Sequence, residues 1–377
     1  MANSLNQIPY INFSAQWQDD RDELLSIIDD VLSSGQYVGG DEVEKFENNV
    51  AELCQVKYAV ALNSGTDALT LAMHLLGVGR GDEVITPPNS FIASTAVIMH
   101  LGAKPVFVDV LPDQNIDPEN IESALTDKTK AIMPVHLTGR ICDMAPITEL
   151  AEKHDLVVVE DAAQAVGSKY KGKLSGSFGH VGCFSTHPLK NLNACGDGGF
   201  ITTNDEKIYS RARALRNHGM ADRNIVNEFG YVSRMDNLQA AILNYRLIKL
   251  DDIIQKRRSN ARTYFEEIQV EQVYIPKEQE YEYNTYHTFV IQVEKRDELI
   301  KFLLNQGIKT AIHYPTPIHL QPASKVLGYN NGDFPSAENQ AKKILTLPIN
   351  QSLSTNEIEV ISTIINNFFE GIIWKVC

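Results

Sequence analysis

The sequence has few basic residues, no long apolar run and no paired cysteines. Lys and Arg number 34 against 48 Asp and Glu, which gives a net charge of -14. A surface of this charge repels nucleic acid and anionic membranes, so any phosphate that the protein binds must be held by local donors. We therefore expect neither a nucleic-acid partner nor a membrane partner.

The cysteines and the first residues exclude other classes. Cys54, Cys142, Cys183, Cys195 and Cys377 form no CxxC pair and no Cys/His spacing of a zinc site. The start, MANSLNQIPYINF, lacks the basic and apolar segments of a signal peptide, and no apolar run approaches the length of a membrane span. We expect reduced thiols, no metal and a cytoplasmic location.

Alternating elements predict an α/β fold. From residue 57 to 204, short runs rich in Val, Ile and Phe alternate with helical patterns, which indicates βα units around a mainly parallel sheet. The run LVVVED is typical of a central strand that is buried on both faces. The predicted strands are residues 58–61, 83–86, 105–108, 131–135, 156–160, 182–185 and 199–202.

The pattern changes after Gly230. A long helix is predicted from 236 to about 268, then a half-buried strand around Phe289–Val293, a helix over 297–305 and a strand over 308–313. Since 377 residues exceed the usual size of one core, we expect two unequal domains. The large α/β domain is placed at residues 1–245 and a small C-terminal α+β domain at 246–377.

The segment NSGTDALTLAMHLLG passes from a strand into a helix, with Ser64, Gly65 and Thr66 at the turn. Free N–H groups, two hydroxyls and the positive end of the helix dipole would hold a phosphate there. A hydroxyl that only caps the helix fits the same residues.

Two polar residues follow the apolar strand at 156–160. Asp161 stands at the carboxyl end of a parallel strand, where open α/β sheets bind their ligands, and its carboxylate could hold a proton on a ring nitrogen. Gln164 lies one helical turn further on and could reach the same ligand. A capping role for Asp161 at the start of a helix is the alternative.

The stretch CFSTHPLKNLNACGDGGFITT holds one lysine, Lys190, after a strand and before a glycine-rich turn that permits close backbone approach. Most lysines are solvated surface residues, but Ser185, His187 and the glycines surround this one in the sequence. Lys190 is the amine that we expect to carry chemistry.

Several motifs in order resemble those of the DegT/DnrJ/EryC1/StrS family of sugar aminotransferases, which depend on pyridoxal 5'-phosphate (PLP). They are SGTDAL, PNSFIAS, GAKPVFVDV, EDAAQAVGSKYKGK, FSTHPLKNLNACGDGG and GYVSRMDNLQAAI, with SGQYVGGDEVEKFE before them and HYPTPIHLQP after them. The resemblance covers nearly the whole chain. It implies a fold-type I aminotransferase, a homodimer with its active site at the interface.

The resemblance also implies roles for the residues found above. Lys190 matches the lysine that carries PLP, Asp161 the partner of the pyridine nitrogen, and Gln164 the neighbour of the O3' oxygen. Phe91 matches an aromatic that stacks on the pyridine ring, which is compatible with core packing. Phosphate contacts are matched by Gly65 and Thr66, which follow Ser64 in the turn described above, and by Ser185. A substrate-proximal loop is matched by His313, Tyr314 and His319.

One position departs from the family pattern. The family commonly has an asparagine in the GYVSRM segment that crosses the dimer interface to the phosphate, whereas this chain has Val232. A valine side chain cannot donate a hydrogen bond. Ser233 or a backbone N–H would have to replace that contact.

The implied reaction moves an amino group from L-glutamate to a nucleotide-linked keto-sugar, with Lys190 as the base that moves the proton. The form HPLKNLNxxGDGG resembles relatives that aminate C3 of a dTDP-3-keto-6-deoxyhexose, or C3 of a UDP-linked hexuronate, more than the TTGEGG form of C4 enzymes. The product would be an amino sugar for a surface glycan such as the lipopolysaccharide O-antigen. The alternatives are a sugar dehydratase, which has histidine in place of the lysine, and a regulatory protein of the same fold.

Overall fold

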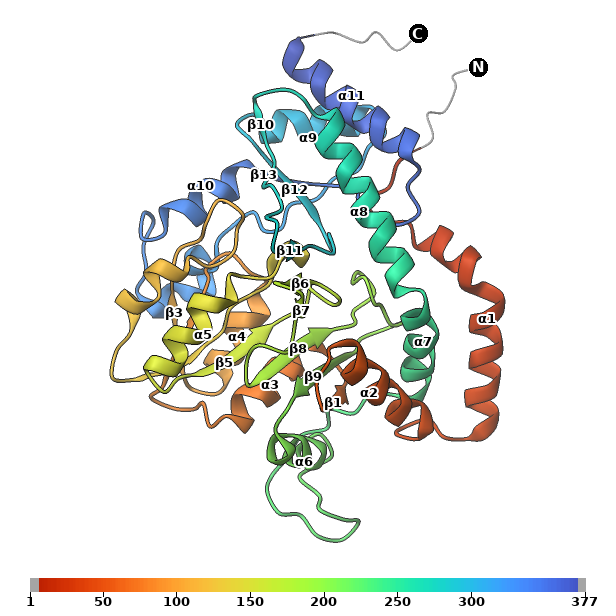
Figure 1. Ribbon diagram of the computed structural model, residues 1–377, viewed down its shortest axis with the longest axis vertical. Coiled ribbons are helices and arrows are strands. Elements are labelled where there is room, and N and C mark those ends of the chain that lie inside the picture. Colours follow the sequence, from red (N-terminus) through yellow and green to blue (C-terminus); the bar gives the residue numbers. More distant parts are fainter. Residues whose placement is uncertain (1–6, 372–377) are drawn as a thin grey trace.

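A computed structural model describes residues 7–371. Its centre is a seven-stranded sheet in the order β1-β9-β8-β5-β4-β2-β3 (Figure 1). β9 is antiparallel to both of its neighbours, whereas the other adjacent pairs are parallel. The strands are β1 (Tyr58–Leu62), β2 (Glu83–Thr86), β3 (Lys104–Phe107), β4 (Thr129–Ile132), β5 (Val157–Asp161), β8 (Val181–Ser185) and β9 (Gly199–Thr203).

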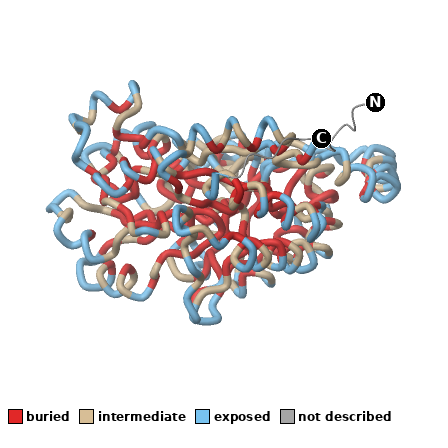
Figure 2. Tube along the Cα trace, turned by 90° about the horizontal axis from the view of Figure 1, so that it is seen from above, coloured by how far each residue is buried: buried red, intermediate tan, exposed pale blue. Residues whose placement is uncertain are grey.

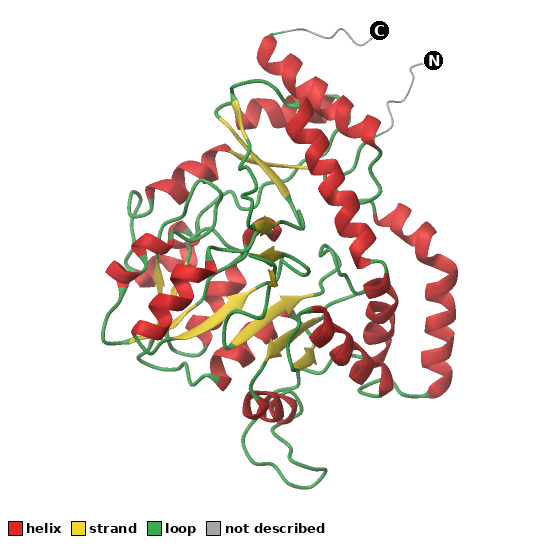
Figure 3. Cartoon of the chain, in the orientation of Figure 1, coloured by secondary structure: helices red, strands yellow, loops and turns green. Residues whose placement is uncertain are grey.

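Helices cover both faces of this sheet (Figure 3). Alternation along each strand explains why: in β1, Val60 and Leu62 enter one apolar cluster, and Ala59 and Ala61 enter the cluster on the other face. The first face is covered by α3 (Gly65–Leu75), α4 (Ile92–His100) and α6 (Glu206–Leu215). The second is covered by α2 (Asp41–Leu53), α5 (Met144–Lys153) and α7 (Asn237–Ile248).

The C-terminal part has its own apolar cluster. A three-stranded antiparallel sheet in the order β10-β12-β13 packs against helices whose apolar residues include Tyr264, Leu299 and Ile361. Its elements are α8 (Leu250–Glu267), β10 (Val273–Tyr274), β12 (Phe289–Val293), α9 (Arg296–Asn305), β13 (Ile344–Leu347) and α11 (Thr355–Glu370). The remaining α-helices and strands of residues 7–371 are α1 (Phe13–Ser34), α10 (Pro335–Lys343) and the short strands β6 (Lys169–Tyr170), β7 (Lys173–Leu174) and β11 (Glu282–Tyr283).

The α/β class with a mainly parallel sheet is confirmed, and all seven predicted strands of the large sheet form within a few residues of their expected bounds. Two expectations differ. The long helix breaks at Lys249, between α7 and α8. The prediction of a strand at 308–313 was wrong. Ile308 forms an isolated bridge with Ile8 and Ala311 forms one with Thr346, so the segment changes partner and no continuous strand pairing results. The division at residue 245 stays a prediction.

Buried residues run continuously through the middle of the molecule, and exposed residues lie at its rim (Figure 2). Within residues 7–371, no helix is long and apolar enough to cross a membrane, and no group of three or more His, Cys, Asp or Glu could hold a metal ion. Cys54, Cys142 and Cys183 are buried free thiols and Cys195 is exposed, whereas Cys377 lies outside the described residues.

Candidate active site

The candidate site lies at the carboxyl ends of two neighbouring parallel strands. Asp161 ends β5, and it pairs in register with Cys183 of β8, two residues before Ser185. Lys190 follows five residues after Ser185, in the loop that leads to β9. The topology therefore brings the predicted acid, hydroxyl and amine to one edge of the sheet, where this class of fold binds ligands.

Asp161 is a buried carboxylate with two donors. Ser94 Oγ donates to its Oδ2 at 2.7 Å, and the backbone N–H of Ala163 donates to Oδ1 at 3.2 Å. Burial raises the pKa of Asp161, while these two hydrogen bonds oppose the rise. The next elements after β5 are the short strands β6 and β7, so no helix begins directly after Asp161 and the residue is not a helix cap. Its carboxylate is held in place to meet a positively charged group.

Lys190 is half-buried, and its backbone N–H donates to the carbonyl of His187 at 2.8 Å. Burial lowers the pKa of Lys190 to about 8, and the Asp161 carboxylate opposes that shift. A substantial share of such an amine is neutral near physiological pH, which is what a nucleophile or a general base requires.

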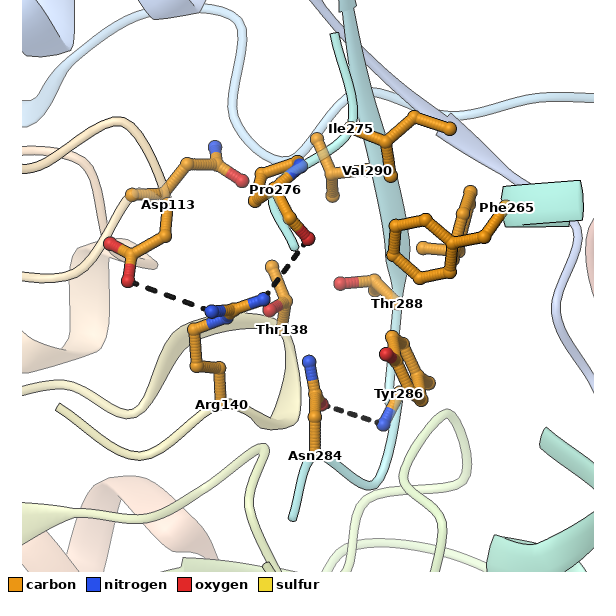
Figure 4. A pocket seen from close by; sticks show the side chains of 12 residues that line it. Asp113, Thr138, Arg140, Phe265, Ile275, Pro276, Asn284, Tyr286, Thr288 and Val290 are labelled. Atoms are coloured by element: carbon orange, nitrogen blue, oxygen red, sulfur yellow. Dashed lines mark hydrogen bonds and ion pairs between the residues drawn. The ribbon is translucent and has the colours of Figure 1, made fainter. Parts of the chain in front are cut away.

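Gln164 is fixed by a turn on the neighbouring segment. Its Oε1 accepts a hydrogen bond from the backbone N–H of Thr138 at 2.8 Å. Two residues on, Arg140 donates to Glu282 Oε2 at 2.7 Å and to the carbonyl of Pro276 at 3.1 Å. Figure 4 shows Arg140 reaching from this turn to Pro276, with Asp113 on its other side. The arginine thus ties the turn that orients Gln164 to the C-terminal part of the chain.

The start of α3 forms a crowded cradle. A Cβ on Gly65 would lie 2.6 Å from Ser185 Cβ, and a Cβ on Gly199 would lie 2.7 Å from the backbone nitrogen of Gly65. Glycine is therefore required for the strand end and the helix start to approach this closely. Ser64 Oγ accepts from the N–H of Asp67 at 3.1 Å, so it caps the helix, while Thr66 is exposed in the first turn.

Three further predicted residues lie around the same edge. The rings of Phe91 and Tyr314 are 5.8 Å apart, and Phe91 is 54% exposed before α4. Burial and then the Asp161 carboxylate raise the pKa of Tyr314 to about 12, and a hydrogen bond with Gln164 opposes the rise. His313 Nδ1 lies 3.0 Å from Thr346 Oγ1.

His319 is committed elsewhere. Its ring is buried, its Nε2 lies 3.0 Å from Glu338 Oε1, and it packs against Phe334 and Phe107. These contacts explain its burial as packing between α10 and β3. Within residues 7–371, His319 forms no hydrogen bond with Asp161 or Lys190.

Sequence reasoning missed four residues of the site. Ser94 lies in the quoted motif PNSFIAS, three residues after Phe91, and its position on a buried helix face was the available signal. Thr138 contributes only its backbone, which no side-chain pattern reveals. His287, whose pKa is lowered by burial and by the charge of Lys190, accepts at its carbonyl from Arg257 at 3.2 Å. The two residues lie 30 positions apart, and no local signal marked either of them.

Comparison with known proteins decides the family. The profile of the DegT/DnrJ/EryC1/StrS aminotransferase family matches residues 18–366. The chain belongs to this family. A relative named pleiotropic regulatory protein from Geobacillus stearothermophilus is 42% identical and covers 96% of this chain and 98% of its own. The dTDP-3-amino-3,6-dideoxy-alpha-D-galactopyranose transaminase of Aneurinibacillus thermoaerophilus is 41% identical, with 96% of this chain and 99% of its own covered.

Solved structures agree with this family assignment. The crystal structure of DesV from S. venezuelae has a TM-score of 0.94 and 38% identity, and covers 97% of this chain and 99% of its own. The PLP form of a putative sugar aminotransferase, Spr1654 from Streptococcus pneumoniae, has a TM-score of 0.87 and 29% identity, with 93% of this chain and 97% of its own covered.

This chain is therefore a PLP-dependent sugar aminotransferase. Its residues fit the cofactor: the cradle at Gly65 suits a phosphate, and the buried Asp161 suits a protonated ring nitrogen. When bound, PLP supplies an electron sink for the carbon that loses its proton. Lys190 would hold and move that proton, Asp161 would keep the ring nitrogen protonated, and Phe91 would cover the ring.

Proposed function

We propose that the chain transfers an amino group from L-glutamate to C3 of a nucleotide-linked keto-sugar, with a dTDP-3-keto-6-deoxyhexose as the acceptor. The observation that carries the proposal is that Lys190 and the buried Asp161 lie at one sheet edge, close enough for the charge of each to shift the pKa of the other, with the GDGG turn of the lysine motif after them. The A. thermoaerophilus relative, named for a dTDP-3-amino sugar, supports the choice of acceptor.

The alternatives differ in the acceptor, not in the chemistry. A UDP-3-keto-hexuronate and a C4 keto-sugar would meet the same lysine and acid. Dehydration is disfavoured because relatives that dehydrate have histidine where this chain has Lys190. A purely regulatory role would not need Lys190, Asp161 and Gln164 together.

The test offers the holoenzyme L-glutamate together with each of three acceptors in parallel. They are dTDP-3-keto-6-deoxyhexose, dTDP-4-keto-6-deoxyhexose and a UDP-3-keto-hexuronate, and NMR locates the new C–N bond. We expect amination at C3 of the first. Amination only at C4 would overturn the acceptor, and a working glutamate half-reaction with no aminated sugar would overturn sugar transfer altogether.

We infer that the active protein is a homodimer in the cytoplasm. The segment from Gly219 to Val232 projects beyond α6 (Figure 1) and exposes apolar side chains, with Phe229 98% and Val232 55% exposed. Exposed apolar side chains on a projecting segment favour a second copy as their cover. Sedimentation should show a dimer at assay concentrations, whereas active monomers would refute it.

Val232 tests the same interface. If the valine leaves a cofactor phosphate short of one donor across the dimer, Val232→Asn should tighten PLP retention. Dialysis followed by absorbance gives the retained fraction. Unchanged or weaker retention would mean that another donor, such as Ser233, already serves the phosphate.

A further inference from the structure

A small cavity lies on the C-terminal side of the site, next to Leu189, the residue that precedes Lys190. It has a volume of about 30 Å³ and is lined by side chains that include Tyr10, Leu189, Arg257, His287 and His313. A cavity needs about 10–15 Å³ to hold one water molecule. The space therefore suits a group the size of two waters, such as a carboxylate, but not a diphosphate.

Arg257 is a buried cation whose charge is not neutralised by an acid. It is 6% exposed, and its Nη1 donates to the carbonyls of Tyr286 and His287 at 3.2 Å each. Its Nη2 donates to Gln351 Oε1 at 3.3 Å, and its buried Nε has no hydrogen-bond partner. Within residues 7–371 it forms no ion pair with Asp or Glu. Burial lowers the pKa of Arg257 to about 10, so it stays charged at neutral pH.

His287 lies close enough to both Lys190 and Arg257 for their charges to lower the pKa of its imidazole. Burial, then the charges of Lys190 and Arg257, hold the pKa of His287 well below its usual value. Burial and Lys190 likewise lower the pKa of His313 to about 4. Both imidazoles are therefore neutral at physiological pH. His287 lines the cavity, and its Nδ1 is buried without a partner.

The loop that carries His287 is also tied to the lysine loop. Asn191, the residue after Lys190, donates from its Nδ2 to the carbonyl of Thr285 at 3.0 Å. This hydrogen bond joins the lysine loop to the loop that lines the cavity.

We propose that this cavity binds a carboxylate of the amino-acid donor, with Arg257 as its cationic partner. The inference rests on the proposed function, in which L-glutamate brings its amino group to Lys190. A buried unpaired charge is costly, and a carboxylate that accepts from a guanidinium removes that cost. A 6-deoxyhexose has no anionic group on its ring, and its diphosphate exceeds the cavity.

The experiment compares Arg257→Gln with Arg258→Gln. Arg258 is the matched control because it neighbours Arg257 on α8 but already pairs with Glu278 at 2.7 Å. Rapid mixing of the PLP-loaded enzyme with L-glutamate, followed by absorbance, gives the apparent Kd of the donor half-reaction. We expect Arg257→Gln to raise that Kd about 10- to 100-fold and Arg258→Gln to change it less than about twofold. Arg257→Lys, which keeps the charge, should recover part of the loss.

Two further readouts separate binding from a structural role. Calorimetric titration of the holoenzyme with glutarate, a dicarboxylate without an amino group, should show binding that Arg257→Gln abolishes. In Arg257→Gln, the sugar half-reaction, started from the amino form of the cofactor, should be impaired by a factor at least about ten times smaller than the donor half-reaction.

Each other outcome overturns the inference. An unchanged donor Kd, or equal losses in both half-reactions with weakened PLP retention, would make Arg257 a structural residue only. A loss confined to the sugar half-reaction would assign the cavity to an anionic acceptor such as a hexuronate. A wild-type enzyme that does not react with glutamate would overturn the proposed function as well, whereas the preceding results would leave it standing.

Discussion

The side chains of Asp161 and Gln164, on the sheet side of the site, are hydrogen-bonded within the chain, whereas Arg257 and His287, on the C-terminal side, each keep a polar atom without a partner. On the sheet side, Asp161 has two donors and Gln164 accepts from Thr138. On the C-terminal side, Arg257 Nε and His287 Nδ1 are buried without partners. The acid and the amide on the sheet side are therefore preorganised, whereas Arg257 and His287 keep hydrogen-bonding capacity that the chain does not use.

This difference matches a division of labour between the two sides. A cofactor that stays bound through both half-reactions needs a fixed acid, amine and phosphate cradle. A substrate that enters and leaves needs groups whose hydrogen bonds are made only when it is present. The comparison predicts that changes on the sheet side abolish chemistry, and that changes on the C-terminal side alter binding or stability.

The largest effect should come from Lys190 on the sheet side. Lys190→Ala removes both the cofactor attachment and the base, so turnover with glutamate and a keto-sugar should fall about 1,000-fold or more. Lys207→Ala, at an exposed lysine of α6, is the control and should keep normal turnover. Normal turnover of Lys190→Ala would contradict the claim that changes on the sheet side abolish the chemistry.

Asp161→Asn should give the second largest loss. The neutral amide no longer favours a protonated ring nitrogen, so the glutamate half-reaction should slow about 100-fold while the protein still folds and binds PLP. Ser94→Ala, which removes one donor to the same carboxylate, should lose less. Stopped-flow absorbance measures the half-reaction rates of the two variants. A near-normal rate for Asp161→Asn would refute the role of Asp161 as the partner of the ring nitrogen.

A change in the cradle should act on cofactor retention. Gly65→Ala would place a Cβ 2.6 Å from Ser185 Cβ, so helix and strand would have to separate and PLP should be retained about tenfold less tightly. At Gly79 a Cβ would meet no atom within 4 Å, so Gly79→Ala is the control. Equal PLP retention by the two variants would show that the close approach is not needed.

The smallest effect concerns pH and the C-terminal side. Burial lowers the pKa of His313 from 6.5 to about 4, so between these values the unfolded chain binds a proton that the folded chain does not. Stability of the cofactor-free protein should therefore fall as pH drops from 6.5 to 4, by up to about 1.4 kcal/mol per pH unit from this residue. Urea unfolding of His313→Asn should show a shallower fall, and an identical slope would contradict the assignment.

Much of the sheet side could be predicted from the sequence because its signals are local. A strand buried on both faces is a continuous apolar run, as in LVVVED, and its end locates Asp161. Lys190 stands beside the glycine-rich turn within one motif. Each of these residues is recognisable from its immediate neighbours.

Arg257 and His287 on the C-terminal side could not be predicted, because their contacts join distant segments. In the sequence Arg257 looks like a solvated helix residue, but it donates to Gln351, 94 residues away, and to the carbonyl of His287. The contact of His319 with Glu338 of α10 was likewise not expected from the sequence, and a substrate role for His319 stays a prediction. The missing strand at 308–313 has the same cause, since its partners are residues 8 and 346.

The central claim, that Lys190 carries the cofactor at the sheet edge, is tested most directly by borohydride reduction of the holoenzyme followed by peptide mapping. Reduction makes the bond between lysine and cofactor permanent, so mass spectrometry identifies the modified residue. The account predicts that the cofactor mass appears on the peptide that contains Lys190. A cofactor found on any other lysine would contradict it.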